Sequence, residues 1–379
     1  MDLQVDRADL RRVQVVRPEP VPLGAGEVRL SIDAFGLTSN NITYAVFGDA
    51  MRYWEFFPGP DEDGTHWGRV PVWGFADVSE SSVSGIEESC RLYGYFPLSD
   101  ELVVRPGRID GRGFTDLAPH RQALPSVYNR YSFTGSDPIY DAGREAQQML
   151  LWPLFVTSFV VDDFLGDHAM FGATCALISS ASAKTSIAAA FLLAGRPGVE
   201  VVGVTSPANL AFVSGLDCYD RVATYEEVTS LVPLDTCYID VAGSPDVTAA
   251  VHGHLGDRLR YSMVMGDTHW ENQAEVPGPL PGPPPTFLFA PDQIAKRRRQ
   301  WGRDQFERTV ADAWNRFAPW TDTWLTIRQV TGAAGVESAY LDLLDGRVDP
   351  QVGDVCTLRH PPGGAGRALE TSPVGSGGR

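Results

Sequence analysis

Short runs of alternating apolar and polar residues fill the first third of the chain, separated by Gly, Pro and acidic residues. Runs of this kind are typical of β-strands joined by turns. The clearest examples are "EVRLSIDAFGL" (27–37), "VPVWGFADVSES" (70–81), "CRLYGYFPL" (90–98) and "ELVVRP" (101–106). The pattern therefore predicts a β-rich unit in this part of the chain.

From about Leu150 the pattern changes to apolar, strand-like runs that alternate with helical segments. The expected strands are "CALISS", "VEVVGVTS", "RVATY", "TCYIDVAG" and "RYSMVMG", and the expected helices cover residues 183–194 and 208–215. Strands that alternate with helices in this way form a parallel sheet covered on both faces. The sequence therefore predicts an α/β fold with a doubly wound parallel sheet.

The last quarter of the chain begins with "VPGPLPGPPPT" (276–286), which cannot continue a helix or a sheet because proline lacks the amide donor and fixes its own φ. We expect a linker or a loop there. An apolar stripe beyond it predicts one amphipathic helix over residues 292–317. Residues 337–358 are predicted to form a helix, a turn and a final strand, and the Gly-, Pro- and Ser-rich residues after His360 a disordered tail.

The composition is ordinary for a soluble globular protein, with 43% hydrophobic and 21% charged residues in a chain of 379. The formal net charge of -17 argues against nucleic acid or an anionic membrane as a partner, because phosphate groups are bound through clustered Lys and Arg. One basic run, "KRRRQWGR" from Lys296, is expected to be a solvated helix face.

The five cysteines are scattered without CxxC spacing, so the sequence suggests neither a disulfide framework nor a zinc ribbon. The N-terminal residues lack an apolar core of signal-peptide length, and no run of about 18 apolar residues occurs. We therefore expect a cytoplasmic protein without a membrane partner.

The stretch "ALISSASAKTSIAAAFLLAG" (176–195) joins an expected strand to an Ala-rich helix through small and hydroxylic residues. Ser180, Ala183 and Ser186 stand at the spacing of a GxxGxxG loop, in which glycines allow a tight turn and a close approach to pyrophosphate. The amides at the start of the helix would point at an anion, and Lys184 would supply a charged donor. The alternative for Lys184 is a solvated surface lysine. The frame GxxxxGK[ST] of a P-loop is absent.

Together with other segments, this stretch resembles the medium-chain dehydrogenase/reductase superfamily, in its quinone oxidoreductase branch. The segments that carry the resemblance follow the order of the superfamily and are "GEVRLSIDAFGLTSNNITYAVFG", "ALISSASAKTSIAAA", "VEVVGVTSPANLAFVSGLDCYDRVATYEE", "TCYIDVAGS", "MVMGDTH" and "AYLDLLDGRVDPQVGDVCTL". The resemblance implies a Rossmann-type domain and a β-rich GroES-like domain formed by the N- and C-terminal parts. It divides the chain into residues 1–140, the first part of the GroES-like domain; 141–285, the dinucleotide-binding domain; 286–360, a helix and the return to the GroES-like domain; and 361–379, the tail.

The resemblance also implies where a dinucleotide would bind. The expected cofactor-binding residues are Ser180, Ala181, Ser182, Lys184, Thr185, Thr205, Ser206, Asn209, Tyr225 and Gly266. The segment "GVTSPAN" at the end of the second strand carries no acidic residue to bond the ribose hydroxyls, so we expect NADP rather than NAD.

Zinc-dependent members of the superfamily use the metal as a Lewis acid, whereas this chain offers Thr38, Asn40 and Asn41 after Gly36 and has no CxxC lobe. We therefore expect no metal. Asn41 and Tyr44 occupy the segment that faces the nicotinamide in the superfamily, and His269 follows an apolar strand, so these three are the candidate catalytic residues. A half-buried core tyrosine is the alternative for Tyr44, and a loop histidine for His269.

The candidate residues of the substrate cleft are Tyr128, Asn129, Tyr131 and Trp270, although a polar seam between domains and a packing Trp would explain them equally well. The expected function is an NADP(H)-dependent, zinc-independent reductase of a carbonyl or a carbonyl-activated C=C bond in a small molecule. The alternatives are a lyase or isomerase without net redox chemistry, or a ligand-binding protein that keeps the fold. A homodimer is one expected assembly.

Overall fold

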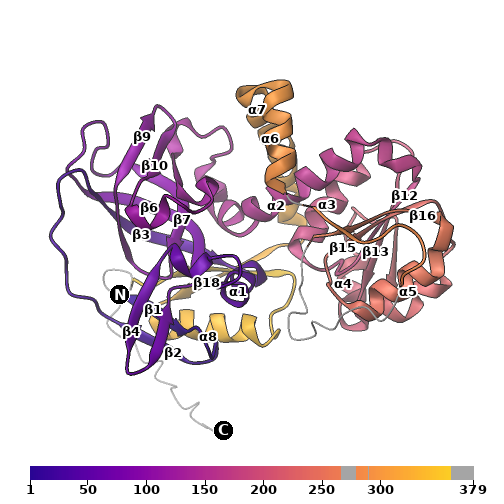
Figure 1. The fold of residues 1–379 in the computed structure, drawn as a ribbon, viewed down its shortest axis with the longest axis horizontal. Helices are drawn as coiled ribbons and strands as arrows, with labels where there is room; N and C mark the ends of the chain where they lie inside the picture. The colour runs from indigo at the N-terminus through magenta and orange to yellow at the C-terminus, as the bar shows by residue number, and fades with distance from the viewer. Residues whose placement is uncertain (266–278, 289, 360–379) are drawn as a thin grey trace, which may run out of the picture.

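The computed structural model describes residues 1–265, 279–288 and 290–359, which form three sheets and the helices around them (Figure 1). The largest sheet has nine strands in the order β18-β19-β3-β6-β7-β11-β10-β9, with β8 paired to β3. Its strands are β3 (Val28–Leu37), β6 (Pro71–Ser81), β7 (Arg91–Pro97), β8 (Glu101–Val104), β9 (Pro106–Asp110), β10 (Gly113–Asp116), β11 (Arg130–Phe133), β18 (Thr326–Thr331) and β19 (Val352–Thr357). The two ends of the chain therefore share one sheet.

A four-stranded sheet in the order β2-β1-β5-β4 packs beside the large one. It consists of β1 (Asp2–Asp6), β2 (Val13–Val16), β4 (Pro58–Glu62) and β5 (Thr65–Gly68). Two helices, α1 (Ser39–Val46) and α8 (Ala333–Leu344), pack against each other, and their apolar faces join the core of this part of the molecule.

The third sheet is parallel throughout, with the strand order β14-β13-β12-β15-β16-β17. Its strands are β12 (Cys175–Ile178), β13 (Glu200–Thr205), β14 (Arg221–Thr224), β15 (Thr236–Asp240), β16 (Leu259–Val264) and β17 (Thr286–Phe287), and its helices are α3 (Lys184–Ala194), α4 (Leu210–Ser214) and α5 (Pro245–Leu255). The direction in which strands are added reverses between β12 and β15. Ligands bind outside the carboxyl ends of the strands at such a switch point.

A long helix, α2 (Glu145–Asp167), connects the β-rich part to the parallel sheet, and the alternating pattern of the sequence did not predict it. By length and composition it could cross a membrane, with a mean hydropathy of 1.5 over its most apolar window. Its apolar residues, among them Leu150, Phe155 and Val161, lie in the largest core of the molecule. Packing inside the protein therefore accounts for the apolar character of α2.

The helix predicted over residues 292–317 is two helices, α6 (Ala290–Trp301) and α7 (Arg303–Trp320). The two helices are separated by Gly302, whose φ of +81° is accessible to glycine and strained for other residues. The basic run is also more than a solvated face. Lys296 and Arg297 of α6 form ion pairs with Asp167 and Asp163 of α2, and the Arg297 Nε–Asp163 Oδ2 distance is 2.7 Å.

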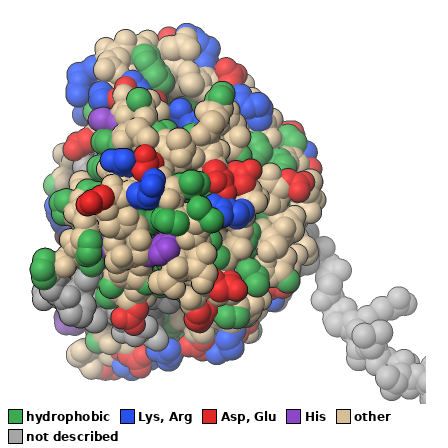
Figure 2. Space-filling model, turned by 90° about the vertical axis from the view of Figure 1, so that its right-hand side faces the viewer, with side chains coloured by type: hydrophobic (Ala, Val, Ile, Leu, Met, Phe, Trp, Pro, Cys, Tyr) green, Lys and Arg blue, Asp and Glu red, His purple; other side chains and the backbone are tan. Residues whose placement is uncertain are grey.

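The face of the molecule on the side of the parallel sheet carries acidic and basic side chains that are interspersed (Figure 2). Apolar side chains are scattered between them. Among the described residues this face shows no continuous basic surface of the kind that binds phosphate backbones.

Candidate cofactor and substrate site

The turn between β12 and α3 is tight although it contains no glycine. Ser180 takes a φ of +49°, the left-handed conformation that glycine normally provides, and Ala181 is fully buried. The required space comes from the neighbouring strand: a Cβ atom added to Gly203 of β13 would lie 2.8 Å from the Cβ of Ala181. The small volume that the loop needs is thus supplied by a glycine on the next strand.

Hydroxyl and amide groups gather around this turn at the carboxyl ends of three adjacent strands. Asn209 Nδ2 donates to Ser182 Oγ at 2.9 Å, and Thr205 Oγ1 lies 3.5 Å from the same oxygen. The hydroxyl of Tyr225 lies 3.5 Å from Ser180 Oγ. The structure therefore brings together five of the residues predicted to bind the cofactor.

Two more predicted cofactor residues lie beside this group. Thr185 is in the first turn of α3, and its carbonyl accepts a hydrogen bond of 2.8 Å from Ser158 Oγ on α2. Ser206 precedes the 3₁₀ turn η7 (Pro207–Asn209), and its carbonyl accepts from the amide of Asn209 at 3.0 Å. These contacts fix the backbone on both sides of the turn.

The end of β15 holds the turn in place from the other side of the switch point. The Asp240 carboxylate accepts hydrogen bonds from Ser179 Oγ at 2.8 Å and from Thr248 Oγ1 at 2.9 Å. It also accepts from the amides of Ala242 and Gly243, each at 3.1 Å. Sequence reasoning missed Ser179 and Asp240, although an acid at the end of a buried strand was a visible signal.

Lys184 makes a different contact from the predicted contact with a phosphate group. Its Nζ donates to the carbonyl of Pro350 at 3.0 Å and to that of Val352 at 2.9 Å. Burial lowers the pKa of Lys184 to about 8, against the opposing effect of the nearby Asp354 and Asp349 carboxylates. In this structure Lys184 ties the start of α3 to the start of β19.

Tyr44 lies on α1, and its hydroxyl oxygen accepts two hydrogen bonds, from Asn40 Nδ2 at 2.7 Å and from Trp73 Nε1 at 3.1 Å. An indole N–H can only donate, so Trp73 does not take the hydroxyl proton of Tyr44. That proton is left for a third group. Burial raises the pKa of Tyr44 well above its usual value, so the phenol is protonated at neutral pH.

An aromatic cluster surrounds Tyr44. Its members are Tyr44, Tyr53, Phe56, Phe57, Trp73, Tyr95 and Tyr128. The ring centroids of Tyr44 and Tyr95 are 5.4 Å apart, and those of Tyr95 and Tyr128 4.8 Å. Of the predicted cleft residues that the structure describes, Tyr128 alone belongs to it. Sequence reasoning missed Trp73 and Tyr95, because nothing local marks a strand residue as facing α1.

Asn41 is not positioned for the predicted catalytic role. Its Oδ1 accepts from the amide of Thr38 at 2.8 Å, and its Nδ2 donates to the carbonyl of Pro71, also at 2.8 Å. The side chain is 3% exposed. These bonds cap the start of α1, so Asn41 serves to hold the helix that carries Tyr44.

Asn129 and Tyr131 are also buried supports rather than residues that line a cleft. Both accept hydrogen bonds from the guanidinium of Arg121, Asn129 Oδ1 at 3.0 Å and the Tyr131 hydroxyl at 2.9 Å. Arg121 also forms an ion pair with Asp116 at 2.9 Å, and each of these two side chains is 1% exposed. This network underlies the aromatic cluster, because the Arg121 guanidinium lies 5.0 Å from the ring centroid of Phe57.

The aromatic cluster and the turn are linked through β19. Lys184 contacts the carbonyl of Val352, two residues before Asp354, which pairs with Leu37 at the end of β3. The helix α1 begins at Ser39, directly beyond β3. The strand β19 therefore contacts both the N-terminus of α3 and the strand that leads into the helix carrying Tyr44.

Three predicted site residues, Gly266, His269 and Trp270, lie outside the described residues. Within residues 1–265, 279–288 and 290–359, no group of three or more His, Cys, Asp or Glu side chains is arranged to hold a metal ion.

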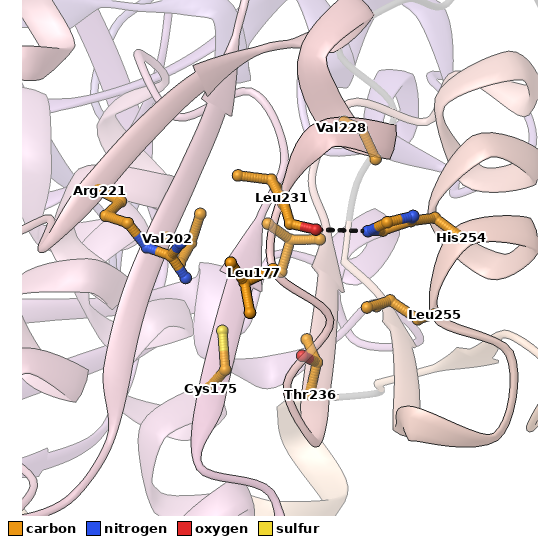
Figure 3. Close-up of a pocket in the computed structure, with 10 residues that line it drawn as sticks. Cys175, Leu177, Val202, Arg221, Val228, Leu231, Thr236, His254 and Leu255 are labelled. Carbon is orange, nitrogen blue, oxygen red and sulfur yellow. Dashed lines mark hydrogen bonds between the residues drawn. The ribbon is translucent and has the colours of Figure 1, made fainter.

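A small cavity lies near the amino ends of the strands of the parallel sheet, opposite to the cofactor turn (Figure 3). Its lining includes Cys175 and Thr236, the first residues of β12 and β15, and His254, whose Nε2 bonds the carbonyl of Leu231 at 2.8 Å. The volume of about 10 Å³ leaves room for about one water molecule. A dinucleotide would not fit there, and ligands of such sheets bind at the other edge.

Residues 35–349 match the family described as "Protein of unknown function (DUF2855)". The chain belongs to this family. A search of the curated proteins finds no match to the sequence.

Solved structures extend the comparison beyond the family. CurA from Vibrio vulnificus in complex with NADPH has a TM-score of 0.57 at 11% identity, covering 92% of this chain and 95% of CurA. YhdH from E. coli K-12 with bound NADPH has a TM-score of 0.54 at 14% identity, covering 95% of this chain and 100% of YhdH. The CurK enoyl reductase has a TM-score of 0.51 at 14% identity, covering 94% and 98%. The fold of this DUF2855 chain is thus that of the medium-chain dehydrogenase/reductases, with a Rossmann-type and a GroES-like part.

Proposed function

We propose that this chain is an NADP(H)-dependent, zinc-independent reductase of a carbonyl, or a carbonyl-activated C=C bond, in a small molecule. The observation that carries the proposal is the convergence of Ser180, Ser182, Thr205, Asn209 and Tyr225 at the carboxyl ends of β12, β13 and β14, beside the switch point of a Rossmann-type sheet. The folds of CurA and YhdH, solved with NADPH, support it.

In this proposal the amides at the start of α3, next to the hydroxyl of Ser182, would bind the pyrophosphate of the dinucleotide. The helix dipole adds to this attraction. Thr205, Ser206 and Asn209 at the end of β13 would hold the adenosine ribose and its 2′-phosphate. The absence of an acid at Thr205 and Ser206 favours NADP over NAD.

The bound cofactor would supply the hydride. Tyr44 would bind the substrate oxygen on which negative charge develops, and would donate a proton to it. Its hydroxyl suits this role because Asn40 and Trp73 both donate to the oxygen and so leave the proton unused. Donors fixed in advance stabilise such charge without reorganisation. This arrangement would replace the Lewis acid of the zinc-dependent members.

The proposal predicts tight binding of NADPH. Titration with NADPH, followed by energy transfer from the nine tryptophans to the bound nicotinamide, should give a submicromolar Kd, and NADH should bind more weakly. A panel of quinones, enones and aldehydes, assayed by loss of NADPH absorbance, should then identify a reducible substrate. Absence of binding by either nucleotide at millimolar concentration would refute the redox function and leave the two alternatives, a lyase or isomerase without net redox chemistry and a ligand-binding protein.

A further inference from the structure

Two hydroxyl groups of the aromatic cluster have protons without an acceptor. Tyr44 accepts two hydrogen bonds, as described above. The hydroxyl of Tyr95 is buried and has no hydrogen-bond partner, and the Tyr95 side chain is fully buried. A buried phenol without a partner loses the hydrogen bonds it would make to water, so such groups are rare and call for an explanation such as a bound water or a ligand that supplies the acceptor.

The two phenols belong to one compact site. Their ring centroids are 5.4 Å apart, and Trp73, which donates to Tyr44, has its ring centroid 5.0 Å from that of Tyr95. The outer side of the cluster is formed by partly buried side chains of Tyr53, Trp73 and Tyr128. Tyr53 and Tyr128 come from two short 3₁₀ turns, and their hydroxyls are 3.4 Å apart, at the long limit of a hydrogen bond.

The charge of the surroundings limits what can bind. Arg121 stacks on Phe56 and Phe57, but its charge is already paired with Asp116 inside the protein. Among the described members of the cluster there is no ionisable group other than phenols, whose protons burial retains. Burying an anionic ligand here without a partner would cost more than burying a neutral one.

We infer that the aromatic cluster binds an uncharged, flat carbonyl compound, and that Tyr95 is a specificity-determining residue that donates a second hydrogen bond to an acceptor on that ligand. This inference rests on the proposed function, in which Tyr44 contacts the substrate oxygen. Aromatic side chains suit a flat ligand because a ligand ring can stack on them or meet them edge to face.

The test uses three small probes of similar shape: acetophenone, its carbonyl-free analogue α-methylstyrene, and the anion benzoate. Ligand-observed NMR titration of the full chain, with and without NADPH, gives their affinities. Acetophenone should bind more tightly than both other probes. Tyr95→Phe should weaken acetophenone binding about 3- to 10-fold, the range for one neutral hydrogen bond, and leave α-methylstyrene binding unchanged.

Thermal unfolding separates this role from a structural one. Tyr95→Phe should leave the unliganded protein as stable or more stable, because it removes a buried hydroxyl without a partner. Tyr340→Phe is the matched control: its hydroxyl donates to the carbonyl of Leu10 at 3.1 Å, so it should lower stability and leave acetophenone binding unchanged.

Three results would overturn the inference: no binding of acetophenone, equal binding of benzoate, or equal acetophenone affinity in the wild type and Tyr95→Phe. The NADPH titration distinguishes its failure from that of the proposed function. NADPH binding without these probe effects would reject the ligand class alone. The probe effects without NADPH binding would reject the reductase and retain a carbonyl-binding site.

Discussion

Lys184 carries a charge in a place where water is scarce. Its ammonium group bonds the carbonyls of Pro350 and Val352, yet burial lowers its pKa to about 8. A lysine whose pKa is lower in the folded state than in the unfolded chain destabilises the fold while it is protonated. This penalty is present in full below about pH 8 and disappears as the pH rises toward the pKa of the unfolded lysine, about 10.5.

Lys184→Met tests this assignment. Between pH 8 and pH 10 the unfolded chain binds more protons than the folded chain, so the stability of the wild type should rise relative to that of Lys184→Met. Chemical denaturation of both proteins over this pH range measures the difference between their free energies of unfolding. The contributions of the titratable groups that both proteins share cancel in this difference. A constant difference would mean that Lys184 is solvated, and would restore the surface interpretation of this residue.

Single residues also show what the sequence could and could not reveal. The spacing of small residues identified the turn of Ser180, because local volume is visible in the sequence. Asn41 was assigned to the site by its position in the resemblance, and Tyr131 as a residue that could line the cleft between domains. Their hydrogen bonds reach Pro71 and Arg121, which only the folded chain brings near. Tyr95 was missed for the same reason.

At the scale of elements, the cofactor turn depends on how closely β13 approaches it. A side chain at Gly203 would meet Ala181 at 2.8 Å and the ring of Tyr219 at 2.9 Å. Ala181 and Tyr219 are fixed relative to each other, because the Tyr219 hydroxyl donates a hydrogen bond to the carbonyl of Ala181 at 2.8 Å. The turn must therefore move if β13 gains even one methyl group.

Gly203→Ala should lower the free energy of unfolding by about 1–3 kcal/mol, the usual cost of overpacking, and should weaken NADPH binding. Gly253→Ala is the matched control, because a Cβ atom there meets nothing within 4 Å on the exposed side of α5. It should stabilise the protein by about 0.5–1 kcal/mol and leave binding unchanged. Equal effects of the two substitutions would contradict the packing argument.

The elements themselves were predicted unevenly. Alternation of strands and helices gave the parallel sheet, since each strand is a short apolar run bounded by turns. The break between α6 and α7 at Gly302 was not predicted, because the apolar stripe continues across it and one glycine does not end a helix by itself. The helix α2 was not predicted, because its apolar residues surround much of the helix and leave no clear helical periodicity of apolar and polar positions.

At the scale of the whole molecule, β19 pairs with β3 and accepts the contact from Lys184. Its pairing with a strand more than 300 residues away leaves no local signal in the sequence. The order of motifs in the resemblance predicted that the ends of the chain share one part of the fold, whereas composition could not. The similarity to CurA and CurK confirms the fold, and the substrate stays a proposal.

Zinc independence is a property of the whole chain and stays a prediction. A zinc site needs three or four ligands, and its cysteines must lose their protons. Each of Cys175, Cys218 and Cys237 is a buried free cysteine. Burial raises the pKa of the Cys175 thiol to about 11 and the pKa of the Cys218 and Cys237 thiols to about 12. In the metal-free chain these thiols are therefore protonated at neutral pH, and zinc binding would have to displace their protons.

Purified protein should accordingly contain well below one zinc ion per chain when measured by inductively coupled plasma mass spectrometry. The measurement covers the entire sequence, including His269. Treatment with a chelator should leave NADPH binding and the activity on a substrate from the panel unchanged, because in the proposed mechanism the substrate oxygen is bound by the Tyr44 hydroxyl, which Asn40 and Trp73 hold in place. One zinc ion per chain that resists dialysis, with activity lost on its removal, would show instead that a metal polarises the substrate.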